Sequence, residues 1–191
     1  MKVKISKTFS ISAPIIDVWE FMTDIKSVSS CIPGAQYNES LGDNKHSVML
    51  NLKVGPIKSS YRSEIAIKSL DESNYTMKIE GRGTDTKGRG GANMEMVGRL
   101  IDKNDGSTEV NGDSTVTIQG MLAQFGTRMI EDVSNQIFVQ FTESLCAKLE
   151  GTREDVNNSS QESNNTLSGT AVAGAAIKGM AGRIMGALKK K

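Results

Sequence analysis

The protein has 191 residues, of which 37% are hydrophobic, 24% are charged and 5% are aromatic. This composition is typical of one soluble globular domain with a short appended segment, and it leaves little room for two full-sized domains. The 23 basic and 22 acidic side chains give a net charge of +1, so no overall basic excess favours nucleic acid as a partner.

The charges are unevenly distributed along the chain. Residues 1–150 carry 17 basic and 19 acidic side chains, residues 151–167 carry 1 and 3, and residues 168–191 carry 5 and 0. A wholly cationic segment requires an acidic partner, and the anionic inner surface of a membrane is one. We therefore expect the last 24 residues to have a function separate from that of the domain.

The N-terminal residues alternate lysine with apolar side chains and lack the continuous apolar core of a secretory signal. We therefore expect a cytoplasmic protein that lies on the inner face of the cell membrane. Cys31 and Cys146 stand alone, without a CxxC partner or a nearby histidine. They are predicted to be free thiols that hold no metal.

The predicted elements begin with a strand over residues 3–11, followed after Pro14 by a helix and by a second short helix over residues 25–30. From Gln36 to Gln119, short alternating runs separated by turn residues predict a meander of six antiparallel strands. Apolar side chains then recur every three or four residues from Leu122 to Leu149, which predicts one long amphipathic helix. The sheet and this helix must bury each other.

The strand face assigned to the interior contains small residues as well as large ones. Small residues under a long helix leave space, and flexible methionines suit an adaptable apolar surface, so the pattern is compatible with an elongated cavity for a lipophilic ligand. Alternatively, the glycines mark bulges that curve the sheet and the methionines fill a solid core. The small residues are Ser59, Ser63, Gly81, Gly98, Gly112 and Ser114.

No motif for catalysis is found. His46 is the single histidine, and it follows a predicted hairpin turn with no serine or cysteine nucleophile in a recognisable motif. The glycine-rich stretch 81–91 joins two strands and does not match a phosphate-binding loop, while Asp85, Lys87 and Arg89 within it form either a polar cluster or a solvated hairpin tip. Binding or carriage is favoured over catalysis, and no catalytic or metal-ligating residue is assigned.

Two further segments follow the predicted domain of residues 1–150. Residues 151–167 are rich in Asn and Ser and are predicted to be a disordered linker. Residues 168–191 form a basic amphipathic tail, which is predicted to anchor the protein at a membrane surface or, alternatively, to dock on a protein. The predicted membrane-binding residues are Ile177, Lys178, Met180, Arg183, Ile184, Leu188, Lys189, Lys190 and Lys191.

The order of these elements resembles the α+β helix-grip fold of the START and Bet v-like superfamily, in which a curved seven-stranded antiparallel sheet wraps around a long C-terminal helix and two short helices follow the first strand. Four segments together resemble the family of the G subunit of carbon monoxide dehydrogenase over residues 1 to about 150. They are Cys31–Ala35, Val54–Ile57 with Tyr61, Asp85 with Gly88, Gly90 and Ala92, and Gly120–Gly126 with Arg128 and Ile130.

The resemblance implies a non-catalytic accessory protein of a molybdenum hydroxylase of the carbon monoxide dehydrogenase type. It implies recruitment of that enzyme to the cytoplasmic membrane and carriage of menaquinone in the helix-grip cavity as electron acceptor. One alternative is a membrane-recruitment or assembly factor without a bound ligand. Another is hydrolase or cyclase activity, which some helix-grip relatives have and which would require converging polar groups inside.

Strand and helix phase assign the candidate ligand-binding residues. The hydroxyl groups of Tyr61, Ser63 or Ser114 could donate to a ring carbonyl. A one-residue error in strand register would invert the strand assignments. The candidates are Tyr61, Ser63, Met77, Met94, Met96, Ser114, Phe125, Met129, Ile137 and Phe141.

Overall fold

The computed structural model describes residues 1–54 and 57–162, with the backbone alone given for Val54, Ile57 and residues 151–162. The end of the predicted linker and the whole predicted membrane-binding tail lie outside the described residues. The predictions for those two parts therefore stay open.

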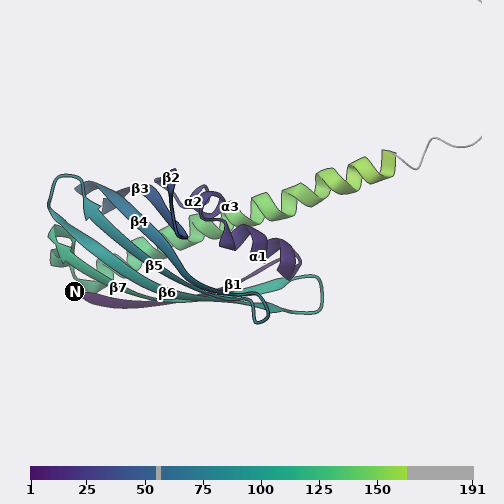
Figure 1. Ribbon diagram of the computed structural model, residues 1–191, viewed down its shortest axis with the longest axis horizontal. Helices are drawn as coiled ribbons and strands as arrows, with labels where there is room; N and C mark the ends of the chain where they lie inside the picture. The colour runs from purple at the N-terminus through teal and green to yellow at the C-terminus, as the bar shows by residue number, and fades with distance from the viewer. Residues whose placement is uncertain (55–56, 163–191) are drawn as a thin grey trace, which may run out of the picture.

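The described chain folds into one curved sheet, two short helices and one long helix (Figure 1), which confirms the predicted helix-grip architecture. The two short helices follow the first strand, and the six further strands follow one another before the C-terminal helix. In chain order the elements are β1 Lys2–Ile11, α1 Ile15–Thr23, α2 Ile25–Ser29, β2 Ala35–Gly42, β3 Lys45–Val54, β4 Ile57–Asp71, β5 Thr76–Asp85, β6 Gly90–Asp102, β7 Thr108–Gly120, η1 Met121–Phe125 and α3 Gly126–Glu162.

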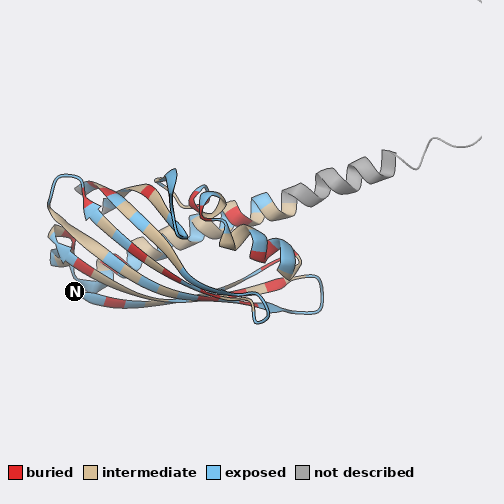
Figure 2. Ribbon diagram, in the orientation of Figure 1, coloured by how far each residue is buried: buried red, intermediate tan, exposed pale blue. Residues whose placement is uncertain are grey.

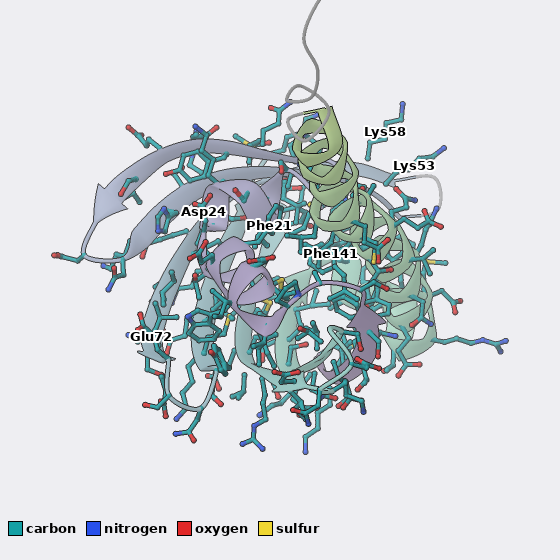
Figure 3. The ribbon with its side chains drawn as sticks, turned by 90° about the vertical axis from the view of Figure 1, so that its right-hand side faces the viewer. Phe21, Asp24, Lys53, Lys58, Glu72 and Phe141 are labelled. Atoms are coloured by element: carbon teal, nitrogen blue, oxygen red, sulfur yellow. The ribbon has the colours of Figure 1, made fainter. Side chains whose placement is uncertain are left out.

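The seven strands form one antiparallel sheet in the order β1-β7-β6-β5-β4-β3-β2. Strand β1 pairs with the last strand, so Lys2 lies opposite Thr117 and Ile11 lies opposite Thr108. Register shifts in β2 and in β4 mark irregularities that increase local twist and bending. Figure 3 looks along α3 and shows the sheet curling around the helix, with α1 and α2 across the nearer end.

Two clusters of buried side chains lie at opposite ends of the concave face. The cluster beside α1 and α2 includes Trp19, Ile25 and Leu145. The cluster beside η1 includes Val3 and Leu122. Burial alternates along the strands (Figure 2), as expected for a sheet with one face toward the interior and one toward water.

The prediction of one continuous helix from Leu122 is wrong for its first residues. Residues 121–125 form the 3₁₀ helix η1, and α3 begins only at Gly126, whose φ of +78° breaks the regular helical backbone. A 3₁₀ helix has three residues per turn instead of 3.6, so the apolar stripe before Gly126 is out of phase with the stripe after it. Glycine adopts positive φ without the steric cost that other residues have.

The far end of α3 also differs from the prediction. Its backbone is helical to Glu162, whereas the sequence predicts a disordered linker from residue 151. Extending a helix is much easier than nucleating one, so a packed helix can continue through a polar segment that would not form a helix alone. No helix among the described residues combines the length and the hydropathy needed to cross a membrane.

Leu145 fixes α3 against the cluster beside α1 and α2, and its side chain has no exposed surface. We expect Leu145→Ala to lower the free energy of unfolding by about 2–5 kcal/mol, because it removes buried contacts and leaves a void. The matched control is Val139→Ala on the same helix, where Val139 is 52% exposed and the expected change is within about 0.5 kcal/mol. Denaturant unfolding measures both, and equal effects would contradict this packing of α3.

Candidate ligand-binding cavity

A cavity of about 510 Å³ lies between the concave face of the sheet and α3. All seven strands, the two short helices, η1 and α3 contribute to its lining. Most of the lining side chains are aliphatic, aromatic or methionine. The volume is within the range of about 300–1,000 Å³ that is usual for sites that bind small molecules.

Glycines face the cavity from three neighbouring strands, and one of them leaves open space. A Cβ on Gly81 would lie 3.2 Å from Ile65 Cδ1, and one on Gly98 would lie 3.1 Å from Met77 Cγ, so larger neighbours already lean over these positions. A Cβ on Gly112 would meet no atom within 4 Å. None of the three glycines lies at a register shift, so the alternative explanation of bulge glycines does not apply to them.

Eight of the ten predicted ligand-binding residues line the cavity. Phe125 and Met129 do not, because they pack outside it against the cluster beside η1. Whether any of the eight contacts a ligand stays a prediction. The eight are Tyr61, Ser63, Met77, Met94, Met96, Ser114, Ile137 and Phe141.

Helix α3 contributes three lining residues outside the predicted apolar stripe, namely Ile130, Ser134 and Phe138. Each directly follows a member of that stripe, so the lining face of α3 is wider than one residue in every four. The glycine pair Gly120 and Gly126 is the sequence signal for the break between η1 and α3, because both residues have positive φ.

Hydroxyl groups supply most of the polar side chains on the inward strand face. Ser114 Oγ donates to the carbonyl of Ile5 at 3.2 Å. Ser63 Oγ lies 3.0 Å from where a Cβ on Gly83 would be, so this hydroxyl covers the glycine. Tyr61 is 6% exposed, and its side chain lies at the same end of the cavity as Ser63.

A charged cluster lies behind Tyr61, at the β5–β6 hairpin. Asp85 is 3% exposed and accepts hydrogen bonds from Arg89 Nε at 3.2 Å and Arg89 Nη2 at 3.0 Å. Its Oδ1 also accepts from the backbone N–H of Lys87 at 2.8 Å. Arg89 Nη2 further donates to Ser59 Oγ at 3.0 Å. Asp85 and Arg89 therefore form a partly buried ion pair, and the alternative of a solvated tip is wrong for Asp85, whereas Lys87 is exposed.

The surroundings of the cluster shift the pKa values of Asp85 and Tyr61 in opposite directions. The hydrogen bonds from Arg89 are the main cause that lowers the pKa of Asp85 to about 2. Burial is the main cause that raises the pKa of Tyr61. Near neutral pH the cluster therefore contains an ionised carboxylate, a guanidinium and a neutral phenol.

The described residues offer little for catalysis. His46 lies in β3 instead of an exposed turn, is half-buried, and pairs through Nδ1 with the Tyr37 hydroxyl at 3.3 Å. Among residues 1–54 and 57–162, no group of three or more His, Cys, Asp or Glu side chains is placed to hold a metal ion. What the site offers is an apolar volume with a few hydroxyl groups at its wall.

The family model for the G subunit of carbon monoxide dehydrogenase (CoxG) matches residues 8–150. The chain belongs to this family. The match covers nearly all of the helix-grip domain, including β2 to β7 and the end of β1. No curated protein matches the sequence.

Solved structures similar to this CoxG family member share its fold. A conserved protein from Geobacillus kaustophilus has a TM-score of 0.72 and 22% identity, covering 78% of this chain and 97% of that one. The ZhuI aromatase/cyclase from Streptomyces sp. R1128 has a TM-score of 0.57 and 16% identity, covering 78% and 94%. A START superfamily protein from Mycobacterium smegmatis has a TM-score of 0.55 and 13% identity, covering 78% and 98%. At these identities the likeness shows the fold alone.

The lowered pKa of Asp85 predicts how its contribution to stability depends on pH. Because the folded pKa is about 2 and the usual value is 3.8, the stabilising contribution is complete above pH 4 and disappears as the pH falls through 2. Asp85→Asn should therefore be less stable than the wild type at neutral pH, and the difference should shrink below pH 4. Denaturant unfolding of both proteins across this range measures it, and a difference independent of pH would contradict the ion pair.

Proposed function

We propose that the protein is a non-catalytic accessory protein of a molybdenum hydroxylase of the carbon monoxide dehydrogenase type. It binds a lipophilic quinone, similar to menaquinone, in the cavity and carries it between the cytoplasmic membrane and the enzyme. Membership of the CoxG family supports the enzyme partner. The cavity carries the proposal for the ligand.

The physical argument starts from the cost of exposing an isoprenoid lipid to water. Apolar surface costs about 25 cal/mol for each Å² exposed, so a long isoprenoid chain leaves a membrane unfavourably unless a protein covers it. The cavity offers a cover of the matching chemistry, because Met77, Met96 and Leu100 line its wall from the sheet and Phe141 lines it from α3. A polar substrate would find few partners there.

The proposed function assigns no catalytic residue, because polar groups in and beside the cavity already have hydrogen-bond partners. The hydroxyl of Ser114 already donates to a backbone carbonyl, and the carboxylate of Asp85 is bound by Arg89. Neither is arranged as a nucleophile with a general base. The lining therefore supports binding and release better than a reaction on the ligand.

Filling the cavity tests the proposal directly. Gly112→Leu adds a side chain where a Cβ meets no atom within 4 Å, so the new side chain should occupy the cavity without displacing the backbone. We expect binding of a short-chain alkyl naphthoquinone, followed by isothermal titration calorimetry, to weaken at least about tenfold because the ligand loses its volume.

The control is Thr117→Leu, which adds the same side chain to the same strand at a position outside the lining. It should bind the naphthoquinone like the wild type. If wild type, Gly112→Leu and Thr117→Leu all fail to bind, the protein is a recruitment or assembly factor without a ligand. If all three bind equally, the ligand lies outside this cavity.

The predicted tail supplies the membrane contact of the proposed function. Its apolar side chains would enter the headgroup region and its basic residues would each add about 1 kcal/mol near an anionic surface. The basic residues are Lys178, Arg183, Lys189, Lys190 and Lys191.

We expect the full chain to float with anionic liposomes and the double substitution Ile177→Gln with Ile184→Gln to float much less, because two buried apolar anchors are lost. The double substitution Gly179→Gln with Gly186→Gln adds the same side chains on the polar side of the predicted helix and should still float. Equal flotation of all three proteins would contradict the anchor and favour docking on a protein.

A further inference from the structure

The end of the cavity beside the β5–β6 hairpin differs chemically from the rest of the lining. Tyr61 of β4 lies opposite Asp85 of β5 in the sheet register, and both side chains belong to the inward face. Tyr61 and Ser63 line the cavity, whereas Ser59, Asp85 and Arg89 lie behind Tyr61 and do not. We call these five residues the polar end of the cavity.

Hydrogen-bond directions within the polar end follow from which groups can donate. A guanidinium only donates, so Ser59 Oγ accepts from Arg89 Nη2 at 3.0 Å. The hydrogen of the Ser59 hydroxyl can then point to Tyr61, two residues along β4, and the Ser59 hydroxyl opposes the rise in the Tyr61 pKa. A Tyr61 oxygen that accepts this hydrogen leaves the Tyr61 O–H for another acceptor.

The net charge of the polar end is close to zero. Asp85 binds Arg89 through two hydrogen bonds of 3.2 and 3.0 Å, so the guanidinium is already neutralised where it meets Ser59. Burial raises the pKa of Tyr61, which keeps the phenol protonated near neutral pH. The polar end therefore presents a neutral donor and offers no unpaired cation to an anionic head group.

The lining also contains two basic residues, Lys7 at the seam between β1 and α3 and Arg82 of β5, which is exposed. Lys7 Nζ hydrogen-bonds Asn135 Oδ1 and lies 5.2 Å from the ring centroid of Phe138. The ammonium group is thus held at the seam, between the strand and the helix. It lies on β1, which is separated from β4 by three strands in the sheet.

Tyr61 and Ser63 reach the cavity from β4. Gly83, across the β4–β5 pair, has no side chain, and a Cβ there would lie 3.6 Å from Tyr61 Cβ and 3.0 Å from Ser63 Oγ. The two β4 side chains therefore cover the glycine, and a head group would bind on their cavity side. At the opposite end, Met22 and Ile25 of the short helices complete an apolar lining.

We propose that the cavity selects lipophiles whose head group carries a neutral hydrogen-bond acceptor, such as a carbonyl oxygen, and rejects lipophiles with an anionic head group. Tyr61 donates to the acceptor, and Ser59, Arg89 and Asp85 are positioning residues that direct its hydroxyl and neutralise the charge behind it. The apolar remainder of the ligand extends toward α1 and α2. This inference rests on the proposed function, since it requires that the cavity binds a lipophile.

The test compares three probes of equal chain length, a methyl ketone, a fatty acid and an alkane, by their displacement of a fluorescent apolar dye from the full chain. We expect the wild type to bind the ketone about tenfold more tightly than the alkane, since one buried hydrogen bond is worth roughly this factor. The fatty acid should bind more weakly than the ketone. Tyr61→Phe should remove the advantage of the ketone and leave the alkane unchanged.

Two further variants separate positioning from a structural role. Ser59→Ala removes the donor to the Tyr61 oxygen and should reduce the advantage of the ketone without affecting the alkane. Asp85→Asn leaves Arg89 without its counter-charge and should strengthen binding of the fatty acid. Tyr75→Phe is the control, because Tyr75 packs edge-on against Trp19 and lies outside the lining.

The outcomes distinguish this inference from the proposed function. If the dye and all three probes fail to bind the wild type, the proposed function is wrong. If the alkane and the ketone bind equally, if the fatty acid binds as tightly as the ketone, or if Tyr61→Phe changes nothing, the polar end selects no head group and only this inference is overturned. Folding of each variant is checked by its thermal unfolding before binding is measured.

Discussion

The structure depends on one constraint, which is that a strongly curved sheet encloses more volume than a single helix can fill. Pairing of β1 with β7 joins the first strand to the end of the meander, and two buried clusters hold α3 at its two ends. Between the clusters, no atom comes within 4 Å of the position of a Cβ on Gly112, whereas Ile65 and Met77 cover Gly81 and Gly98. Protein interiors are normally close-packed, so a space of about 510 Å³ is a candidate binding site.

The two ends of this space have different chemistry. Near α1 and α2 the lining is aliphatic and aromatic, which suits the chain of a lipid. Near the β5–β6 hairpin, Tyr61 stands in front of the buried Asp85–Arg89 ion pair, which suits a polar head group. A ligand with one polar and one apolar end therefore has a defined direction in the cavity. The proposed carriage of such a lipid is compatible with membership of the family of the G subunit of carbon monoxide dehydrogenase.

Much of this could be predicted from residue patterns, because period-two alternation and turn residues report directly on strands with one buried face. The strand residues Met77, Met94 and Met96 line the cavity as predicted. Predictions failed where a backbone conformation or a distant partner decides the outcome. Gly126 separates η1 from α3, and Phe125 before it lies outside the cavity. Met129 also lies outside, although Val133 four residues later in the same helix lines the cavity. Arg89, which pairs with the buried Asp85, also donates to Ser59 of another strand, and local charge patterns carry no information about that contact.

The most direct measurement of the central claim is mass spectrometry of lipids extracted from the full-length protein purified from the organism that makes it. The account predicts a neutral lipophile with a carbonyl-bearing head group, a quinone in the proposed function, in near-equimolar amount with the protein. A protein that retains no lipophile, although its fold is intact and its purification avoids detergent, would contradict the claim that the cavity is a carrier site.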